Sequence, residues 1–325
     1  MTQKLLKPAA FAVAGFSALI GYAHLETKWF TLRHVSVPVL APGQPDVRIL
    51  QLADLHLVEN QHTKLAWLAC LADLNPDLVV DTGDNISSAA AIPALLAVLA
   101  QPGPDGGRPL LEVPGVFVGG SNDYFAPKPK NALRYLLGPS KYKSATLPKL
   151  PWRELFDAFA ASGWVNLNNR RAEVVLDDGR MLSFVGTNDA HIGLDKFPAL
   201  PAGAVPSAGS RGAAESSSRS PAPLQPIAHM GVTHAPYKRV LLEFDRDAVA
   251  LVIAGHTHGG QLCIPGFGAL VTNCDLERKY ASGLHRWRDI WLYVSAGAGT
   301  SPYAPFRFAC RPSATLLTLT AASDH

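Results

Sequence analysis

The chain has 325 residues, of which 48% are hydrophobic and only 17% are charged. This composition can bury a large core, which excludes wholesale disorder. The formal net charge of +3 is too small and too scattered to predict a nucleic-acid-binding protein. The four cysteines lie far apart and form no C-x-x-C pair, which argues against zinc-ribbon and disulfide-framework folds.

The first 25 residues contain an apolar run, 8–23, that follows Lys4 and Lys7. It fits a signal peptide with a weak small-x-small cleavage site, an uncleaved anchor with the lysines on the cytoplasmic side, or a helix packed on the domain. Because the run offers no polar face to water, we favour an anchor or membrane-dipping segment over 1–25. We therefore expect a membrane-associated protein, with the extracytoplasmic side favoured for the rest of the chain.

An extended linker is predicted over 26–46, and a globular domain over 47–325. The first elements of that domain, in chain order, are a strand at 47–53, a helix at 61–73, a strand at 78–81, a helix at 89–100 and a strand at 115–118. This β-α-β-α-β order predicts a mostly parallel or mixed sheet with helices on its faces.

The remaining elements include a hairpin with its turn at Asp177-Asp178-Gly179. Helices are predicted at 130–137 and 152–162, and strands at 165–167, 171–176, 181–186, 227–233, 248–254 and 290–295. The segment 199–226 is dominated by Ala, Gly, Ser and Pro. We interpret it as a flexible insertion within the domain, because core-like strands resume directly after it.

Five predicted strands are followed directly by metal-binding types of side chain. These are Asp54-Leu55-His56, Gly83-Asp84-Asn85, Gly120-Ser121-Asn122-Asp123, Thr233-His234 and Gly255-His256-Thr257-His258-Gly259. The carboxyl ends of strands build the sites of open α/β sheets, so these side chains should meet at one edge. Imidazole, carboxylate and amide groups bind divalent metals. This donor set exceeds the needs of one ion and suits two ions bridged by a carboxylate.

These blocks, in this order, resemble the calcineurin-like metallophosphoesterase superfamily, whose pattern is D-x-H, G-D-x, G-N-H-[DE], a lone H and G-H-x-H. The resemblance runs from about Arg48 to the C-terminus and implies a four-layer αββα sandwich, in which two mixed sheets are flanked by helices. Members hydrolyse phosphomonoesters, phosphodiesters or pyrophosphate bonds. The G-H-T-H-G-G-Q block and the apolar N-terminus are most similar to a bacterial membrane-associated branch, related members of which act on UDP-diacylglucosamine or similar lipid-linked phosphates.

The resemblance also implies two divalent ions, drawn from Mn, Fe, Zn and Ni. It assigns Asp54, His56 and His258 to one ion, Asp84 to both ions as a bridge, and Asn122, His234 and His256 to the second. The ions polarise the phosphoryl oxygens and lower the pKa of a bridging water, and the resulting hydroxide attacks phosphorus.

The third block departs from the family pattern, because Gly-Asn-His-Asp is replaced by Gly-Ser-Asn-Asp. A gapless match puts Ser121 at the ligand position and Asn122 at the catalytic histidine. We assign Asn122 as the ligand, since an amide oxygen binds a cation better than a hydroxyl does. The histidine that assists the leaving group is then absent. Asn122, Asp123 and His191 are the candidate catalytic residues, and hydrogen bonding within a loop is the competing interpretation for Asp123 and His191.

The sequence thus predicts a dinuclear metal-dependent phosphoesterase acting on a phosphodiester or pyrophosphate bond, because better leaving groups tolerate the missing histidine. The apolar N-terminus suggests a lipid-linked substrate. The alternative is a catalytically weak metal-binding sensor or scaffold at the membrane. A metallopeptidase is disfavoured, since the chain has no His-Glu-x-x-His motif. Arg307 and Arg311 are candidates for binding an acidic substrate group, although solvated arginines are the commoner finding.

Overall fold

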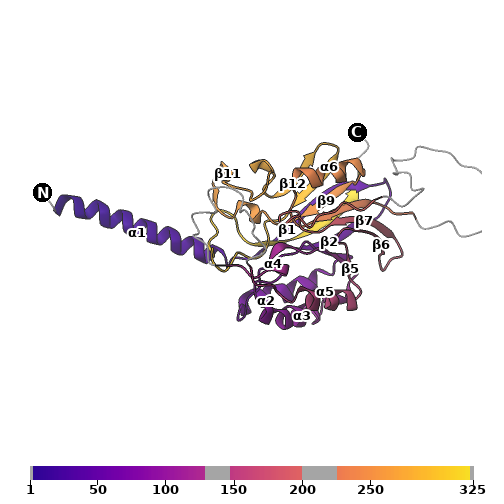
Figure 1. The fold of residues 1–325 in the computed structure, drawn as a ribbon, viewed down its shortest axis with the longest axis horizontal. Coiled ribbons are helices and arrows are strands. Elements are labelled where there is room, and N and C mark those ends of the chain that lie inside the picture. The colour runs from indigo at the N-terminus through magenta and orange to yellow at the C-terminus, as the bar shows by residue number, and fades with distance from the viewer. Residues whose placement is uncertain (1–2, 129–146, 200–224, 323–325) are drawn as a thin grey trace, which may run out of the picture.

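The computed structural model describes residues 3–128, 147–199 and 225–322, with side chains from residue 14 onward. Two six-stranded sheets form the centre of the domain (Figure 1). The first sheet has the order β1 (Thr31–Leu40), β14 (Ser313–Ala321), β2 (Val47–Leu52), β3 (Leu78–Asp81), β4 (Gly115–Phe117) and β5 (Val165–Asn166). The second has the order β12 (Gly283–Trp287), β13 (Ile290–Val294), β9 (Leu251–Ala254), β8 (His229–Thr233), β7 (Met181–Thr187) and β6 (Arg170–Val175).

Both sheets are mixed. Strands β2, β3, β4 and β5 run parallel, whereas β14 pairs antiparallel with β2. In the second sheet β13, β9, β8 and β7 run parallel, and antiparallel strands β12 and β6 close its two edges. A small hairpin of β10 (Cys263–Ile264) and β11 (Gly268–Ala269) lies outside both sheets. The parallel centre of each sheet directs its strand ends to one edge of the domain.

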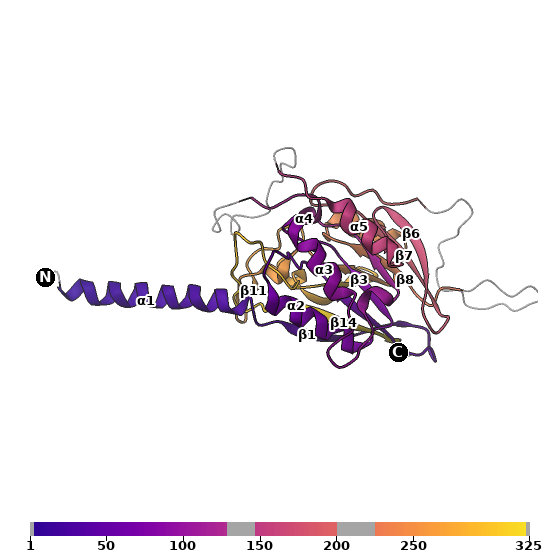
Figure 2. The ribbon, with the colours of Figure 1, turned by 90° about the horizontal axis from the view of Figure 1, so that it is seen from below.

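The layers follow from the alternation of buried side chains along each strand. In β3, Val79 packs toward the helices, whereas Leu78 and Val80 pack toward the second sheet. The helices on the first sheet are α2 (His62–Cys70), α3 (Ile92–Leu99) and α5 (Trp152–Ala161), and α6 (Lys238–Arg246) covers the opposite side (Figures 1 and 2). The result is the predicted arrangement of two mixed sheets flanked by helices.

Most predicted elements agree with the structure to within a few residues. Two helices are shorter than predicted because they change pitch at one end. Helix α2 stops at Cys70 and continues as a 3₁₀ turn, Leu71–Leu74, while a 3₁₀ turn at Ala89–Ala91 precedes α3. The helix predicted at 130–137 and most of the insertion 199–226 lie outside the described residues.

The predicted linker 26–46 is wrong in one respect, because it contains an edge strand of the first sheet. Strand β1 pairs in parallel with β14, and Val37 and Leu40 are fully buried. The sequence analysis assigned no strand at 313–321. The local pattern could show that 31–40 is extended, but not that the far end of the chain supplies its partner.

Helix α1 (Gln3–Glu26) extends away from the domain (Figure 1). Phe16, Leu19 and Ile20 are exposed. Within the described residues the helix contacts the domain at its base, where the Glu26 carboxylate accepts hydrogen bonds from the backbone N–H groups of residues 309 and 310 at 3.0 and 2.6 Å. No helix in the described part of the chain is both long and apolar enough to span a bilayer.

Candidate metal centre

The predicted ligands come from the carboxyl ends of five strands in both sheets. Asp54 and His56 follow β2, Asp84 follows β3, Asn122 follows β4, His234 follows β8, and His256 and His258 follow β9. The structure brings these side chains together at one edge of the domain, as the distances below show. All are buried except Asn122, which is half-buried.

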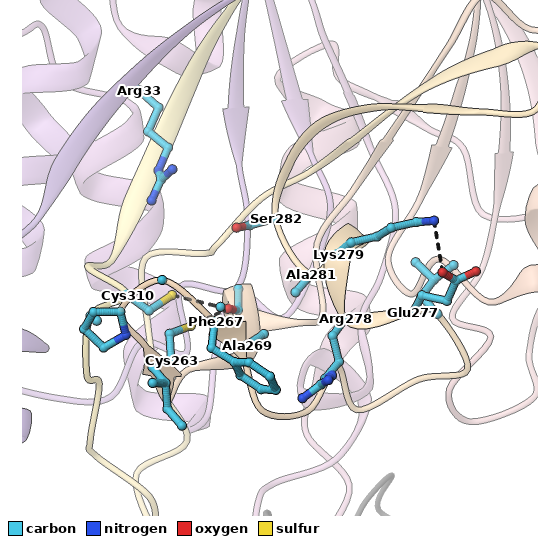
Figure 3. A pocket seen from close by; sticks show the side chains of 17 residues that line it. Arg33, Cys263, Phe267, Ala269, Glu277, Arg278, Lys279, Ala281, Ser282 and Cys310 are labelled. Atoms are coloured by element: carbon cyan, nitrogen blue, oxygen red, sulfur yellow. Dashed lines mark hydrogen bonds and ion pairs between the residues drawn. The ribbon is translucent and has the colours of Figure 1, made fainter.

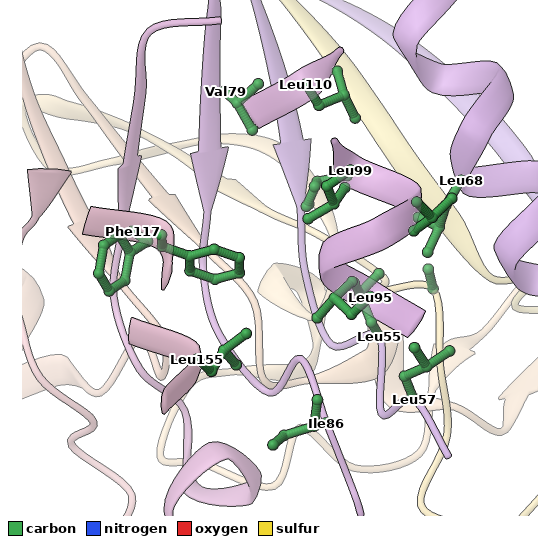
Figure 4. Packing of buried hydrophobic residues seen from close by; sticks show 14 of the residues in the cluster. Leu55, Leu57, Leu68, Val79, Ile86, Leu95, Leu99, Leu110, Phe117 and Leu155 are labelled. Carbon is green, nitrogen blue, oxygen red and sulfur yellow. The ribbon is translucent and has the colours of Figure 1, made fainter. Parts of the chain in front are cut away.

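Core packing sets the direction of the first ligands. Leu55 and Leu57 are buried in the core under α2 and α3 (Figure 4). Asp54 and His56 alternate with these leucines along the chain, and their donor atoms converge on the group described below instead of entering that core. Burial of the leucines anchors the segment that carries the two ligands.

The backbone is strained at five of the predicted ligands. Asp54, His56, Asp84, His256 and His258 have φ of 50°, 44°, 58°, 72° and 51°. Non-glycine residues rarely adopt this left-handed region, and each such residue costs of order 1 kcal/mol or more. Strain concentrated at one cluster is typical of a functional site, where the surrounding structure holds it in place.

One group of donors joins Asp54, His56 and His258, each offering an atom within 4.8 Å of the others. The Nε2 atoms of His56 and His258 are 3.1 Å apart, and His258 Nε2 is 3.9 Å from Asp54 Oδ1. Two imidazole nitrogens and a carboxylate converging in this way form a donor set for a divalent cation. This is the set that the resemblance assigns to the first ion.

A second group is centred on Asp84. Its Oδ2 lies 3.4 Å from His56 Nε2 and 3.5 Å from His234 Nε2, so it lies between the two donor sets. Asp54, Asp84 and His234 also converge within 4.8 Å. His256 lies beside this group, with its Nδ1 3.3 Å from His234 Nε2. Asp84 therefore lies between the histidines of the two donor groups.

Backbone carbonyls orient the histidines. His234 Nδ1 donates to Thr82 O at 2.8 Å, and His258 Nδ1 donates to Gly299 O at 3.1 Å. A proton held at Nδ1 leaves the lone pair of Nε2 directed into the centre, which is the usual arrangement behind metal-binding histidines.

The electrostatics of the centre also favour cation binding. Burial lowers the pKa of His56 to about 4, so its imidazole is neutral at pH 7. Burial also lowers the pKa of His234, but the charges of Asp84, Asp189 and Asp54 outweigh this effect and raise it to about 9. Excess negative charge around His234 is what a bound cation would neutralise.

The Asn122 side chain contacts the bridging position. Its Nδ2 donates to Asp84 Oδ2 at 2.7 Å, and its backbone N–H donates to Asp84 Oδ1 at 2.7 Å. Ser121, the gapless match to the family ligand, is buried next to it. The structure thus places Asn122 at the centre through contact with Asp84, and its role as a ligand stays a prediction.

The other two candidate catalytic residues have different surroundings. The Asp123 carboxylate accepts backbone N–H groups of Asp84, Asn85 and Gly120 at 2.9, 2.8 and 2.9 Å. The carboxylate thus joins the loops that follow β3 and β4, and a catalytic role for Asp123 stays a prediction. His191 lies in the site, with its ring 4.6 Å from that of His256 and its Nδ1 3.0 Å from the Tyr237 hydroxyl.

Arg307 is not available to a substrate, contrary to the sequence-based suggestion. It is fully buried, and its Nη2 donates to Ala296 O and Gly299 O at 2.7 Å each. Gly299 O is also the acceptor for His258, so Arg307 supports that ligand from behind. Sequence analysis could not distinguish this arginine from a surface one, because its acceptors are backbone carbonyls.

Lys64 is a buried residue beside the centre that the sequence pattern did not identify. It is buried, and its Nζ donates to Leu55 O at 2.6 Å, between the first two ligands. Burial lowers the pKa of Lys64 to about 7. The available signal was its spacing of four from Leu68, which places both on the buried face of α2.

A cavity of about 860 Å³ is lined by Gly259, the residue after His258, and by the β10–β11 hairpin (Figure 3). Cys263 and Cys310 lie at one side of it, and their thiols donate to Gly259 O at 3.2 and 3.6 Å. Cys310 also donates to His258 O at 3.3 Å. The two thiols thus support the ligand turn from the cavity side.

Comparison with known proteins agrees with this geometry. The family model described as calcineurin-like phosphoesterase matches residues 47–260. The chain belongs to the calcineurin-like phosphoesterases. It is 26% identical over 329 residues to the phosphodiesterase YaeI of Escherichia coli (strain K12), a match that covers 98% of each chain. It is 35% identical over 71 residues, 22% of its length and 24% of the relative, to the uncharacterized metallophosphoesterase YkuE of Bacillus subtilis (strain 168).

Membership in the calcineurin-like phosphoesterases and the two donor groups together support a metal-dependent phosphoesterase. The donor atoms of each group lie within 4.8 Å of one another, and carbonyls hold Nδ1 of two imidazoles so that Nε2 faces the centre. The residues present therefore fit divalent metal ions and a phosphoester substrate.

Proposed function

We propose that this protein hydrolyses a phosphodiester or pyrophosphate bond with two divalent metal ions. The observation that carries the proposal is the position of Asp84, whose Oδ2 lies 3.4 and 3.5 Å from histidines of the two donor sets. When bound, the ions would polarise phosphoryl oxygens and supply an activated water. Asp54, His56 and His258 would hold one ion, Asp84 both, and Asn122, His234 and His256 the other.

The chain's own residues favour a substrate with a good leaving group. The third block supplies Asn122 in place of the family histidine, and an amide cannot donate a proton as an acid does. Both carboxylate oxygens of Asp123 accept hydrogen bonds from backbone N–H groups. His191 is the candidate acid, because its ring lies in the site, 4.6 Å from that of His256. A pyrophosphate, or a diester with a weakly basic leaving group, therefore suits the site better than an alkyl monoester. The phosphodiesterase YaeI, similar along the whole chain, supports this choice.

The test replaces the bridging carboxylate by its amide, Asp84→Asn. An amide cannot bridge two cations as an anion does, so we expect at least about 100-fold slower turnover of bis(p-nitrophenyl) phosphate and a loss of bound Mn²⁺ measured by mass spectrometry of metal content. Chelation of the unaltered protein should abolish turnover, and Mn²⁺ should restore it. Asp157→Asn, at an exposed position of α5, is the matched control. Full activity of Asp84→Asn would exclude the dinuclear mechanism.

A catalytically weak metal-binding sensor or scaffold is the second candidate, and the Gly-Ser-Asn-Asp block favours it. Restoring the family order with Ser121→Asn and Asn122→His discriminates the two. A large gain in turnover of both a diester and a monoester would indicate a degenerate enzyme. Robust turnover of the unaltered protein with no gain in the variant would indicate a site built to work without the histidine.

We also propose that α1 dips into a membrane surface and that the substrate is lipid-linked, with the extracytoplasmic side as the proposed location. The exposed Phe16, Leu19 and Ile20 support membrane contact, because isolated apolar side chains of a projecting helix have no partner in the described domain. Such a helix would place the metal centre near amphiphilic phosphoesters.

A further inference from the structure

A second cavity, of about 520 Å³, lies beside the metal centre at the ends of β4, β5 and β7. Tyr124, on its wall, is two residues from Asn122 along the chain. Ile192, on the opposite segment, follows His191, whose ring lies 4.6 Å from that of His256. The segments 122–124 and 191–192 thus connect the metal centre to two walls of the cavity.

The charged side chains in the described lining of the cavity are all positive. Lys149, Arg153 and Arg170 line it, and its lining contains no Asp or Glu within the described part of the chain. None of the three forms an ion pair with another described residue. Arg153 instead lies over the ring of Trp152, 4.2 Å from its centroid, which holds the guanidinium at the wall. Such a cavity attracts anions.

Three asparagines supply directional donors in the same wall. The Oδ1 atoms of Asn166 and Asn168 accept the backbone N–H groups of residues 168 and 119 at 2.9 and 3.0 Å. Asn188 Oδ1 accepts the backbone N–H of residue 189 at 2.7 Å and the hydroxyl of Tyr124 at 2.9 Å. Because backbone N–H groups can only donate, these bonds fix which amide atom is oxygen. In each case the NH₂ group keeps its donors, with no acceptor among the described residues.

We propose that this cavity is a subsite that binds a second phosphate group of the substrate. Cationic side chains and amide NH₂ donors are the groups that bind phosphate oxygens, and carboxylates that would repel them are absent from the described lining. The inference rests on the proposed phosphoesterase function and deepens it, since it selects substrates with a second anionic group beyond the bond that is cleaved.

The experiment compares two esters that differ only in the second phosphate: thymidine 5′-(p-nitrophenyl phosphate) and the same ester carrying a 3′-phosphate. The unaltered protein should favour the doubly phosphorylated ester about tenfold or more in kcat/KM, mainly through KM. The double variant Arg153→Gln, Arg170→Gln should bring this ratio close to one. Arg246→Gln, at an exposed position of α6 outside the cavity, should keep the ratio of the unaltered protein.

Equal kcat/KM for the two esters in the unaltered protein would overturn the subsite, as would an unchanged ratio in the double variant. If neither ester is hydrolysed, the proposed function fails, and the subsite is then judged by calorimetry with thymidine 3′,5′-bisphosphate. Binding weakened about tenfold by the double variant and unaffected by Arg246→Gln would support the subsite on its own. Equal binding by all three proteins would exclude it.

Discussion

At the scale of single residues, the metal centre depends on close approach of backbone to ligand. Gly120 lies so near the bridging position that a Cβ built there would be 2.3 Å from Asp84 Oδ1 and 2.8 Å from His234 Cε1. No side chain fits at such distances. Gly120 is therefore required by the volume of the ligands next to it, independently of its own backbone conformation.

We predict that Gly120→Ala displaces the Asp84 carboxylate and lowers Mn²⁺ affinity by at least about tenfold, a typical effect of disturbing the groups that position a metal ligand. Calorimetric titration with Mn²⁺ measures the change. Gly21→Ala, in the exposed part of α1 with nothing within 4 Å of the new Cβ, is the control. Unchanged Mn²⁺ affinity in Gly120→Ala would contradict the requirement for a glycine at this position.

At the scale of elements, one partly buried ion cluster joins helix α6 to strands β6 and β8 of the second sheet. Asp247 is the C-terminal cap residue of α6, and its carboxylate accepts hydrogen bonds from both Nη atoms of Arg171 in β6 at 2.7 Å each. It also accepts Nε2 of His229 in β8 at 2.9 Å. These hydrogen bonds fix α6 to the two strands. Apolar contacts alone have no direction and would leave the helix free to slide over the sheet.

We predict that Asp247→Asn lowers the free energy of unfolding by about 2 kcal/mol, because it leaves Arg171 without its anion in a partly buried position. Urea unfolding measures the change. Glu243→Gln, which breaks an exposed pair with Arg246 in the same helix, should change stability by less than about 0.5 kcal/mol. Equal effects of the two variants would contradict the role given to the cluster.

The effect of Asp247→Asn on the free energy of unfolding should also depend on pH. Burial raises the pKa of Asp247, but the hydrogen bonds from His229 and Arg171 outweigh burial and hold it below its usual value of 3.8. A depressed carboxyl pKa contributes stability that is fully present above the unfolded value and is lost as the pH falls through the folded value. The difference in free energy of unfolding between the unaltered protein and Asp247→Asn should thus narrow as the pH falls below about 4.

At the scale of the whole molecule, α1 is the feature that departs most from a compact enzyme (Figures 1 and 2). We predict that the full chain co-sediments with vesicles containing anionic lipid. The triple variant Phe16→Ser, Leu19→Ser, Ile20→Ser should bind at least about tenfold more weakly, because each substitution removes apolar area that would enter the interface. Val175→Ser, at an exposed apolar position of β6, is the control. Equal binding of all three proteins would remove the basis for a membrane role of α1.

The sequence by itself determined the layered α/β fold and the candidate ligands, because both depend on local order along the chain. A buried parallel strand is a short apolar run, and the polar residue after it lies at the edge where strands end. The pattern from Asp54 to His258 could therefore be interpreted without coordinates, and the structure brings those side chains within contact of one another.

Only the tertiary structure decided which residues that are far apart in the sequence contact one another. The pairing of β1 with β14 joins residues near opposite ends of the chain, and Arg307 acquires its role from carbonyls that a local pattern does not encode. Asp123 likewise became a loop-joining residue through backbone N–H groups of another segment. Such contacts depend on close packing in three dimensions, whereas residue type and spacing report only which segments are buried and where each of them ends.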